Sequence, residues 1–348
     1  MKLRLPRFLV PAVLLLAATV AGSAQTTVTT DPVGFVQATL VPSSDGTVRK
    51  FTAISFPLHQ TPIFVGLVAS VSGSTVNLTG SSLGDVTSAP YLLHVKSAVN
   101  SLATGRSFLI TLSSSTSVTV NPQGVPLSAI LSGSDQVGIY QANTLGSVFG
   151  AIDSDVQLKG GSTVGNSDVV YMWNGNGWGA YFYIPTYGWV LNGDGSFAIS
   201  NNTPIYPDEG VLVGRISTAT LPSTYAMIQG TVPTNTQNVF ASGGGSLTFV
   251  SNPLPTPVTF AQFGFTSAPS WLPGNTAGNA DNVYLWQNNG WLTYFYISGY
   301  GWVLNGDGSF AVQDNTAIPA GAAFLVRRRT TISASNSIIP VPLTYSLN

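Results

Sequence analysis

The side chains that most often carry out catalysis are scarce in this sequence. Its two histidines, His59 and His94, each lie in an apolar stretch, and its single glutamate, Glu209, lies in a Pro-Asp-Glu-Gly turn. A hydrolytic triad would need a serine, a histidine and an orienting carboxylate in one place. A glycosidase needs only two carboxylates, which the 13 acidic residues could supply. Because no such set is specified by motif or spacing, the sequence predicts a protein that is not an enzyme and has no cofactor or catalytic residue.

Tryptophan and tyrosine are the other residues that could bind a ligand, and six of the seven tryptophans lie in two similar segments. Planar rings on a rigid sheet can stack on the apolar faces of sugars, while nearby Asp and Asn side chains bond to the hydroxyls. The same rings could instead pair across strands and hold a small sheet together. The candidate ligand-binding residues are Trp178, Tyr181, Tyr183, Trp189 and Asp194, with Trp291, Tyr294, Tyr296, Trp302 and Asp307.

An Asn-Gly-Asp-Gly-Ser motif occurs in both segments, at 192–196 and 305–309. Alternating Asx oxygens can surround a calcium ion. The motif lacks the spaced carboxylates and the distal glutamate of a calcium loop, so turn formation is the favoured interpretation and no metal site is predicted.

The two aromatic segments are copies of one another. Residues 171–199 align with residues 284–312 without a gap, at an offset of 113, and 21 of the 29 positions are identical. The similarity extends outwards, where Asp168 matches Asp281. A fainter copy lies near the front, because Ser55-Phe-Pro-Leu58 resembles Ser251-Asn-Pro-Leu254. Such matches indicate duplicated modules.

Short runs rich in Val, Ile, Thr, Phe and Tyr, bounded by Gly, Asn, Ser or Pro, predict strands through most of the chain. Single helical turns are expected at 125–131 and 143–149. Each aromatic segment predicts a meander. In the first copy its strands are 169–173, 178–184 and 196–199, with turns at 174–177 and 192–195.

The predicted fold class is therefore all-β, with consecutive duplicated modules built as small barrels or sandwiches and few short helices. The predicted organisation is a signal peptide at 1–24, a first module at 25–122, and second and third modules with the aromatic segment at 123–229 and 230–348. The boundaries lie near Pro122 and Gly230.

Composition limits the partners. The absence of cysteine excludes disulfides and thiolate metal sites. Charged residues make up 7% of the chain, against roughly 25% in average globular proteins. The basic run Arg327–Arg329 is interpreted as the solvated end of an edge strand. Without further clusters of Lys and Arg, no nucleic-acid partner is expected.

The N-terminus predicts export. Three basic residues precede the apolar run 8–20 and the small residues Ala21-Gly-Ser-Ala24, as in a secretory signal peptide cleaved after Ala24. Cleavage would leave nine basic against 13 acidic residues, a net charge of −4. No later run is long enough to span a membrane. The expected location is extracellular or at the bacterial cell surface, with the periplasm as the other compartment that fits.

Two resemblances accompany these patterns. Thr29-Thr-Asp-Pro-Val-Gly-Phe-Val36, Ile54-Ser-Phe-Pro-Leu58 and the Gly-x-x-Phe-Leu-Val-Arg endings resemble a family of uncharacterised exported proteins of verrucomicrobial bacteria. The resemblance implies export and a duplicated β architecture, and supplies no catalytic residue. The aromatic segments also look like the hairpins of cell-wall-binding modules, which repeat about every 20 residues rather than every 113.

The sequence thus predicts an exported, non-catalytic structural or cell-surface interaction protein that can associate with copies of itself. The alternative is a carbohydrate-binding protein that uses the duplicated Trp/Tyr meander on an extracellular polysaccharide. Exposed, coplanar rings would favour the second function, and buried rings the first.

Overall fold

The computed structural model describes residues 32–150, 158–217, 224–268, 270–329 and 337–346. Within these ranges the protein is mostly β, with one closed six-stranded barrel, several sheets and few short helices, which confirms the predicted fold class. The predicted signal peptide at 1–24 lies outside the described residues.

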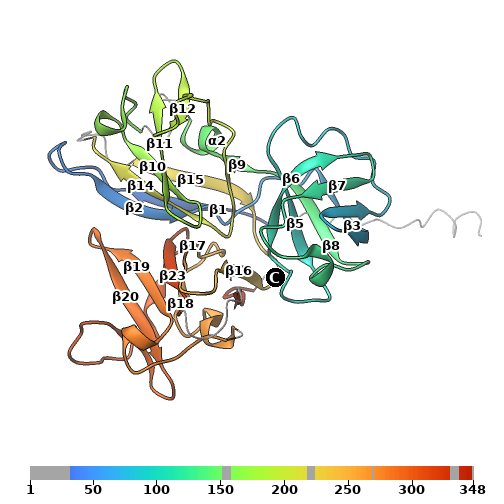
Figure 1. Ribbon diagram of the computed structural model, residues 1–348. Helices are drawn as coiled ribbons and strands as arrows, with labels where there is room; N and C mark the ends of the chain where they lie inside the picture. Colours follow the sequence, from blue (N-terminus) through green and yellow to red (C-terminus); the bar gives the residue numbers. More distant parts are fainter. Residues whose placement is uncertain (1–31, 151–157, 218–223, 269, 330–336, 347–348) are drawn as a thin grey trace, which may run out of the picture. The chain divides into compact units, whose positions relative to one another are not determined.

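The closed barrel has the strand order β3-β4-β7-β6-β5-β8 (teal in Figure 1). Its core consists mainly of Val, Leu and Ile side chains together with Phe108. The single turn η1 (Leu127–Ala129) lies inside the predicted range 125–131. The strands are β3 (Phe64–Ser72), β4 (Thr75–Leu78), β5 (Tyr91–Ser97), β6 (Ser107–Ser113), β7 (Ser117–Val120) and β8 (Gln136–Gln141).

Strands on either side of the barrel in the sequence form what we call the first lobe. Its five-stranded sheet has the order β12-β11-β10-β14-β2, and two pairs, β1-β15 and β13-β9, complete it. The lobe comprises β1 (Val33–Leu40), β2 (Lys50–Ser55), β9 (Asn143–Thr144), α2 (Leu145–Phe149), η2 (Val164–Asn166), β10 (Val169–Trp173), β11 (Trp178–Ile184), β12 (Gly188–Leu191), β13 (Pro204–Ile205), β14 (Gly210–Arg215) and β15 (Thr224–Thr231).

The second lobe repeats this order. Its sheet is β17-β23-β19-β20-β21, and its pairs are β16-β24 and β18-β22. The lobe comprises β16 (Gln237–Ala241), β17 (Leu247–Ser251), β18 (Val258–Thr259), η3 (Gly264–Ser267), η4 (Ala277–Asn279), β19 (Asn282–Gln287), β20 (Gly290–Ile297), β21 (Gly301–Leu304), β22 (Ala317–Ile318), β23 (Ala323–Arg327) and β24 (Ser337–Val341).

Equivalent strands of the two lobes pair in the same register. Trp173 lies opposite Trp178 in the first lobe, as Trp286 lies opposite Trp291 in the second. The first two strands of the meander have their predicted bounds. The third was wrong: β12 occupies 188–191, and residues 196–199 form a loop that touches the sheet only where Ile199 bridges Val190. Two consecutive turns, closed by Asp194 N–H to the Leu191 carbonyl and by Phe197 N–H to the Asp194 carbonyl, take up the residues that would have formed the return strand.

Strand pairing crosses the predicted boundary near Pro122. β1 and β2 belong to the predicted first module, yet they pair with β15 and β14 of the predicted second. Residues 64–141 then lie between β2 and β9 as an inserted barrel. Pairing between distant strands leaves no local pattern in the sequence, because strand periodicity marks the strands and not their partners.

The basic run is not the solvated end of an edge strand, because β23 pairs with strands on both sides. Arg328 is buried, and its Nε lies 2.7 Å from Oδ2 of Asp281. The first lobe has the equivalent buried pair, with 3.4 Å between Arg215 Nε and Asp168 Oδ2. Backbone N–H groups also donate to both carboxylates, which satisfies their remaining lone pairs.

The lobes exchange reciprocal contacts. Trp173 Nε1 donates to the carbonyl of Leu247 in the second lobe at 3.0 Å, and Trp286 Nε1 donates to the carbonyl of Phe51 in the first at 2.8 Å. Two backbone bridges follow the same pattern, Ile54 with Ala322 and Glu209 with Val250. An isologous dimer interface has this arrangement, here within a single chain.

Candidate functional site

Several of the predicted ligand-binding rings are buried. Trp189 and Trp302 are each 1% exposed. Trp189 donates through Nε1 to the carbonyl of Gly150 at 3.0 Å, and Trp302 stacks on Phe260 with 4.9 Å between ring centroids. Tyr294 is also buried. Without a free face, these rings cannot stack on a sugar, and they form the cores of the two lobes.

The remaining predicted rings are half-buried. Trp178 and Trp291 meet the same ring, Phe249, edge to face at 5.0 Å and 6.1 Å between centroids. They belong to the apolar cluster that joins the two lobes. Tyr183 and Tyr296 pack against the buried tryptophans of their own lobes, and Tyr181 packs on the core of the first lobe. Cross-strand and inter-lobe packing thus occupies most of the aromatic meander.

Asp194 and Asp307 shape turns. Each carboxylate accepts a hydrogen bond from the serine hydroxyl two residues on, at 2.8 Å in both copies, and another from the serine N–H. These bonds to Ser196 and Ser309 lower the pKa of both aspartates. The predicted turn chemistry fits this geometry.

The loops that these turns begin, together with the turns before β12 and β21, carry exposed aromatic residues that were not predicted from the sequence. We call Tyr187, Phe197 and Ile199 the first aromatic tip, and Tyr300, Phe310 and Val312 the second. Tyr187 and Phe197 are 47% and 51% exposed, and their equivalents 52% and 49%. The tyrosine hydroxyl donates to the phenylalanine carbonyl at 2.9 Å in each. A signal was present, because the two copies share the Tyr of Tyr-Gly-Trp and the Phe of Gly-Ser-Phe-Ala although neither ring belongs to a lobe core.

Backbone strain accompanies these tips. Phe197 and Phe310 have φ angles of 51° and 52°, a region that bulky residues rarely adopt. Such conformations cost on the order of 1–3 kcal/mol each and cluster at functional sites. Each loop therefore presents an apolar ring to solvent in a conformation that glycine or asparagine would adopt more readily.

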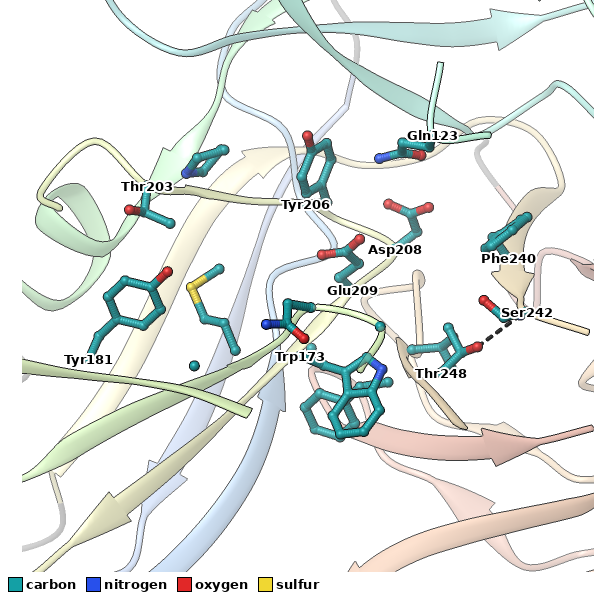
Figure 2. A pocket seen from close by; sticks show the side chains of 18 of the residues that line it. Gln123, Trp173, Tyr181, Thr203, Tyr206, Asp208, Glu209, Phe240, Ser242 and Thr248 are labelled. Carbon is teal, nitrogen blue, oxygen red and sulfur yellow. Dashed lines mark hydrogen bonds between the residues drawn. The ribbon is translucent and has the colours of Figure 1, made fainter. Parts of the chain in front are cut away.

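A second feature of interest is a cavity of about 470 Å³ between the first lobe and strands β16 and β17 (Figure 2). Trp173, Tyr181, Phe240 and Phe249 supply aromatic walls. Polar groups converge on it from the turn before β14, from the turn between β10 and β11, and from the barrel. They are Gln123, Asn174, Tyr206, Asp208 and Glu209.

Burial perturbs the acids of this cavity. Desolvation raises the pKa of Glu209 to about 8, and the nearby Asp208 carboxyl contributes to the shift. The pKa of Asp208 rises to about 6 because its desolvation outweighs the opposing charge of Arg106. Desolvation and both acids also raise the pKa of Tyr206. The Pro-Asp-Glu-Gly pattern showed a turn and gave no sign of this cavity.

The second lobe has a cavity at the equivalent place, of about 270 Å³. Trp286 takes the place of Trp173, while Pro319, Gly321 and Ala322 replace Tyr206, Asp208 and Glu209 at the offset of 113. The two cavities share a backbone frame and differ in their chemistry.

The histidines come together unexpectedly, with 4.0 Å between the ring centroids of His59 and His94. Nδ1 of His94 lies 3.0 Å from Oγ of Ser107. All three side chains are buried, and burial lowers the pKa of His59 to about 4. A buried dyad offers a substrate no approach, so this pair packs the junction between β5 and the segment after β2.

Comparison with protein-family models, with curated proteins and with solved structures found no match. Among the described residues, no group of three His, Asp or Glu side chains could hold a metal ion. No helix in the described part of the chain is long and apolar enough to cross a bilayer.

Proposed function

We propose that this protein is an exported, non-catalytic binding protein that attaches to polysaccharide through its two aromatic tips. The observation that carries the proposal is the repetition on both lobes of an exposed tyrosine and an exposed phenylalanine with an aliphatic neighbour, with the same strained φ at the phenylalanine. Scattered exposed apolar residues are normal, but an identical pair of aromatic sites on a rigid frame is not.

The chemistry of each tip suits a sugar surface. Tyrosine and phenylalanine rings offer apolar faces, and the exposed Asn192 and Asn305, which directly follow β12 and β21, can bond to hydroxyls. The turn bonds of Asp194 and Asp307 fix the loops before binding, which limits the entropy lost. Two tips on one chain can bind a repetitive polymer together, which raises the avidity above the affinity of either tip.

We do not assign Asp208 and Glu209 the role of the two catalytic carboxyl groups of a glycosidase. Catalytic carboxyl groups must flank the scissile bond from two sides. Asp208 and Glu209 are consecutive residues of one turn, so they approach any ligand from one wall. The protein is therefore assigned a binding function only.

The test is co-sedimentation with insoluble cell-wall and algal polysaccharides, with wild-type protein and with Phe197→Asn, Phe310→Asn and the double variant. Asparagine removes the ring and tolerates positive φ, so folding is preserved. We expect each single variant to bind at least tenfold more weakly and the double variant not to bind. Tyr225→Ser, which removes an exposed ring elsewhere, is the matched control. Unchanged binding of the double variant would refute the proposal.

A second candidate function, self-association, is favoured by one other surface. Val33 and Phe35 on β1 and Tyr225 and Met227 on β15 are exposed on one face of a two-stranded pair. With 7% charged residues, the surface offers little repulsion between copies. Light scattering over a concentration series would show a dimer that Phe35→Ser with Met227→Ser disrupts. A monomer at every concentration would exclude this function.

A further inference from the structure

The cavity of the first lobe contains a buried polar atom without a partner among the described residues, and further unpartnered atoms lie on Arg106, outside its lining. Asp208 is 7% exposed and lines the cavity, yet its Oδ1 has no hydrogen-bond partner among the described residues. Arg106, 1% exposed, has three unpartnered side-chain nitrogens within the same described set. Buried groups of this kind are rare and call for a specific explanation.

The fold does not require these acids. The N–H of Ser251 donates to the carbonyl of Asp208 at 3.1 Å, and the N–H of Ser55 donates to the carbonyl of Gly321 at 2.8 Å. The equivalent backbone contact thus forms with aspartate in one lobe and glycine in the other. The carboxyl groups of Asp208 and Glu209 are therefore not needed for the backbone contact, and their desolvation is costly. Acids kept at such a cost indicate a ligand-binding site.

The charged groups around the cavity indicate the sign of the ligand's charge. Within the described ranges, Arg106 is the cation that acts on Asp208, whose pKa it lowers, and no cation is found to shift the pKa of Glu209. Its guanidinium lies over the rings of Phe108 and Phe240, at 5.0 Å and 5.4 Å from the centroids, and is not part of the cavity lining. Arg106 balances the charge of Asp208, whereas Glu209 keeps its proton at neutral pH because its pKa is raised to about 8. An ammonium group that displaces this proton would supply Glu209 with the positive charge it lacks.

The walls indicate the rest of the ligand. Trp173, Tyr181 and Tyr206 surround the acids, and Figure 2 shows the carboxyl groups of Asp208 and Glu209 on the side of the cavity where Tyr206 and Gln123 lie. Aromatic faces attract organic cations. A cavity of about 470 Å³ accommodates a small molecule. We propose that this cavity is a second binding site, distinct from the aromatic tips, and that it binds a small organic cation with a primary amine against Asp208 and Glu209.

Tryptophan fluorescence and calorimetry at neutral pH would test this with matched pairs of probes. Glucosamine, putrescine and benzylamine carry the amine, and N-acetylglucosamine, butanediol and benzyl alcohol are their uncharged counterparts. The protein used is Phe197→Asn/Phe310→Asn, so that binding at the tips does not contribute. We expect saturable binding of at least one amine, at least tenfold tighter than its neutral counterpart.

Variants locate the site. Asp208→Asn/Glu209→Gln should weaken amine binding at least tenfold, whereas Asp85→Asn, which alters an exposed acid of the barrel outside the cavity, should not change it. The single variant Glu209→Gln keeps the side-chain shape and leaves Asp208 opposite Arg106, so a loss of binding in it would not come from unfolding. Equal binding of amine and neutral counterpart, no binding by any amine, or unchanged binding in the double variant would each overturn the proposal.

Discussion

At the scale of single residues, burial separates the tryptophans of the meander by role. Trp189 and Trp302 fill the two lobe cores, and phenylalanine rings cover them. Because removal of a buried tryptophan leaves a large cavity, Trp302→Ala should lower the free energy of unfolding by about 3–5 kcal/mol. Urea denaturation would measure this. Phe35→Ala, at an exposed ring, should change stability by less than about 0.5 kcal/mol. Equal effects would contradict the assigned roles.

The strained phenylalanines allow an opposite prediction. Asparagine adopts positive φ more readily than phenylalanine, and the ring of Phe197 is about half exposed. Phe197→Asn should therefore raise the free energy of unfolding by about 1 kcal/mol while it removes binding by that tip. The same denaturation experiment checks it, with Tyr225→Asn as the control. A clear loss of stability would mean that the ring packs in the native fold.

Glu209 predicts a pH dependence with a definite sign. Its pKa is about 8 in the folded protein against 4.5 as the ordinary value. Between these values the folded state binds more protons than the unfolded state, so the free energy of unfolding falls as the pH rises. Above pH 6.5 the histidines no longer oppose this trend, because their folded pKa values are lowered.

Melting temperatures from pH 6.5 to 8 would measure this effect. We expect a decrease in the wild type and a much flatter profile in Glu209→Gln, with Asp194→Asn retaining the wild-type slope. If the melting temperature of the wild type does not change in this range, the pKa of Glu209 is not raised in the folded protein.

At the scale of elements, the reciprocal tryptophan bonds join the two lobes. Trp173→Phe keeps a ring in the inter-lobe cluster but leaves the carbonyl of Leu247 without its donor. We expect a loss of about 1–2 kcal/mol, and a similar loss for Trp286→Phe. Denaturation of both single variants and the double variant measures the coupling. If neither single variant is less stable than the wild type, and the double variant is not either, these bonds do not hold the lobes together.

The sequence predicted individual elements better than their partners. β10 and β11 have their predicted bounds, and both predicted helical turns are present. These elements depend on local residue patterns and turn residues. By contrast, the pairing of β1 with β15 depends on contacts almost 200 residues apart, which no local pattern encodes.

The same distinction applies to the candidate sites. The Asn-Gly-Asp-Gly-Ser turns were recognisable from the sequence because their hydrogen bonds are local. The environment of Asp208 depends on Arg106, about 100 residues earlier in the barrel, and on Trp173 from another strand. Periodicity showed that the aromatic strands have two faces, but it could not show that both would be covered.

At the scale of the whole molecule, the barrel is inserted into one lobe and contacts the other. The side chain of Asn238 on β16 donates to the carbonyls of Ser101 and Thr104 in the barrel turn before β6. The barrel thus contributes Gln123 to the cavity and lies against the strand that carries Phe240. A ligand in the cavity would contact three parts of the chain that are remote in sequence.

The reciprocal contacts between the lobes have a consequence for how this protein can change. In a homodimer every substitution is made twice, so an acid placed in one subunit also appears in the other. Joining both halves in one chain removes that constraint. One half can accept Asp208 and Glu209 while the other keeps Gly321 and Ala322. Selection can then act on a new chemistry in one half, while the other half preserves the fold.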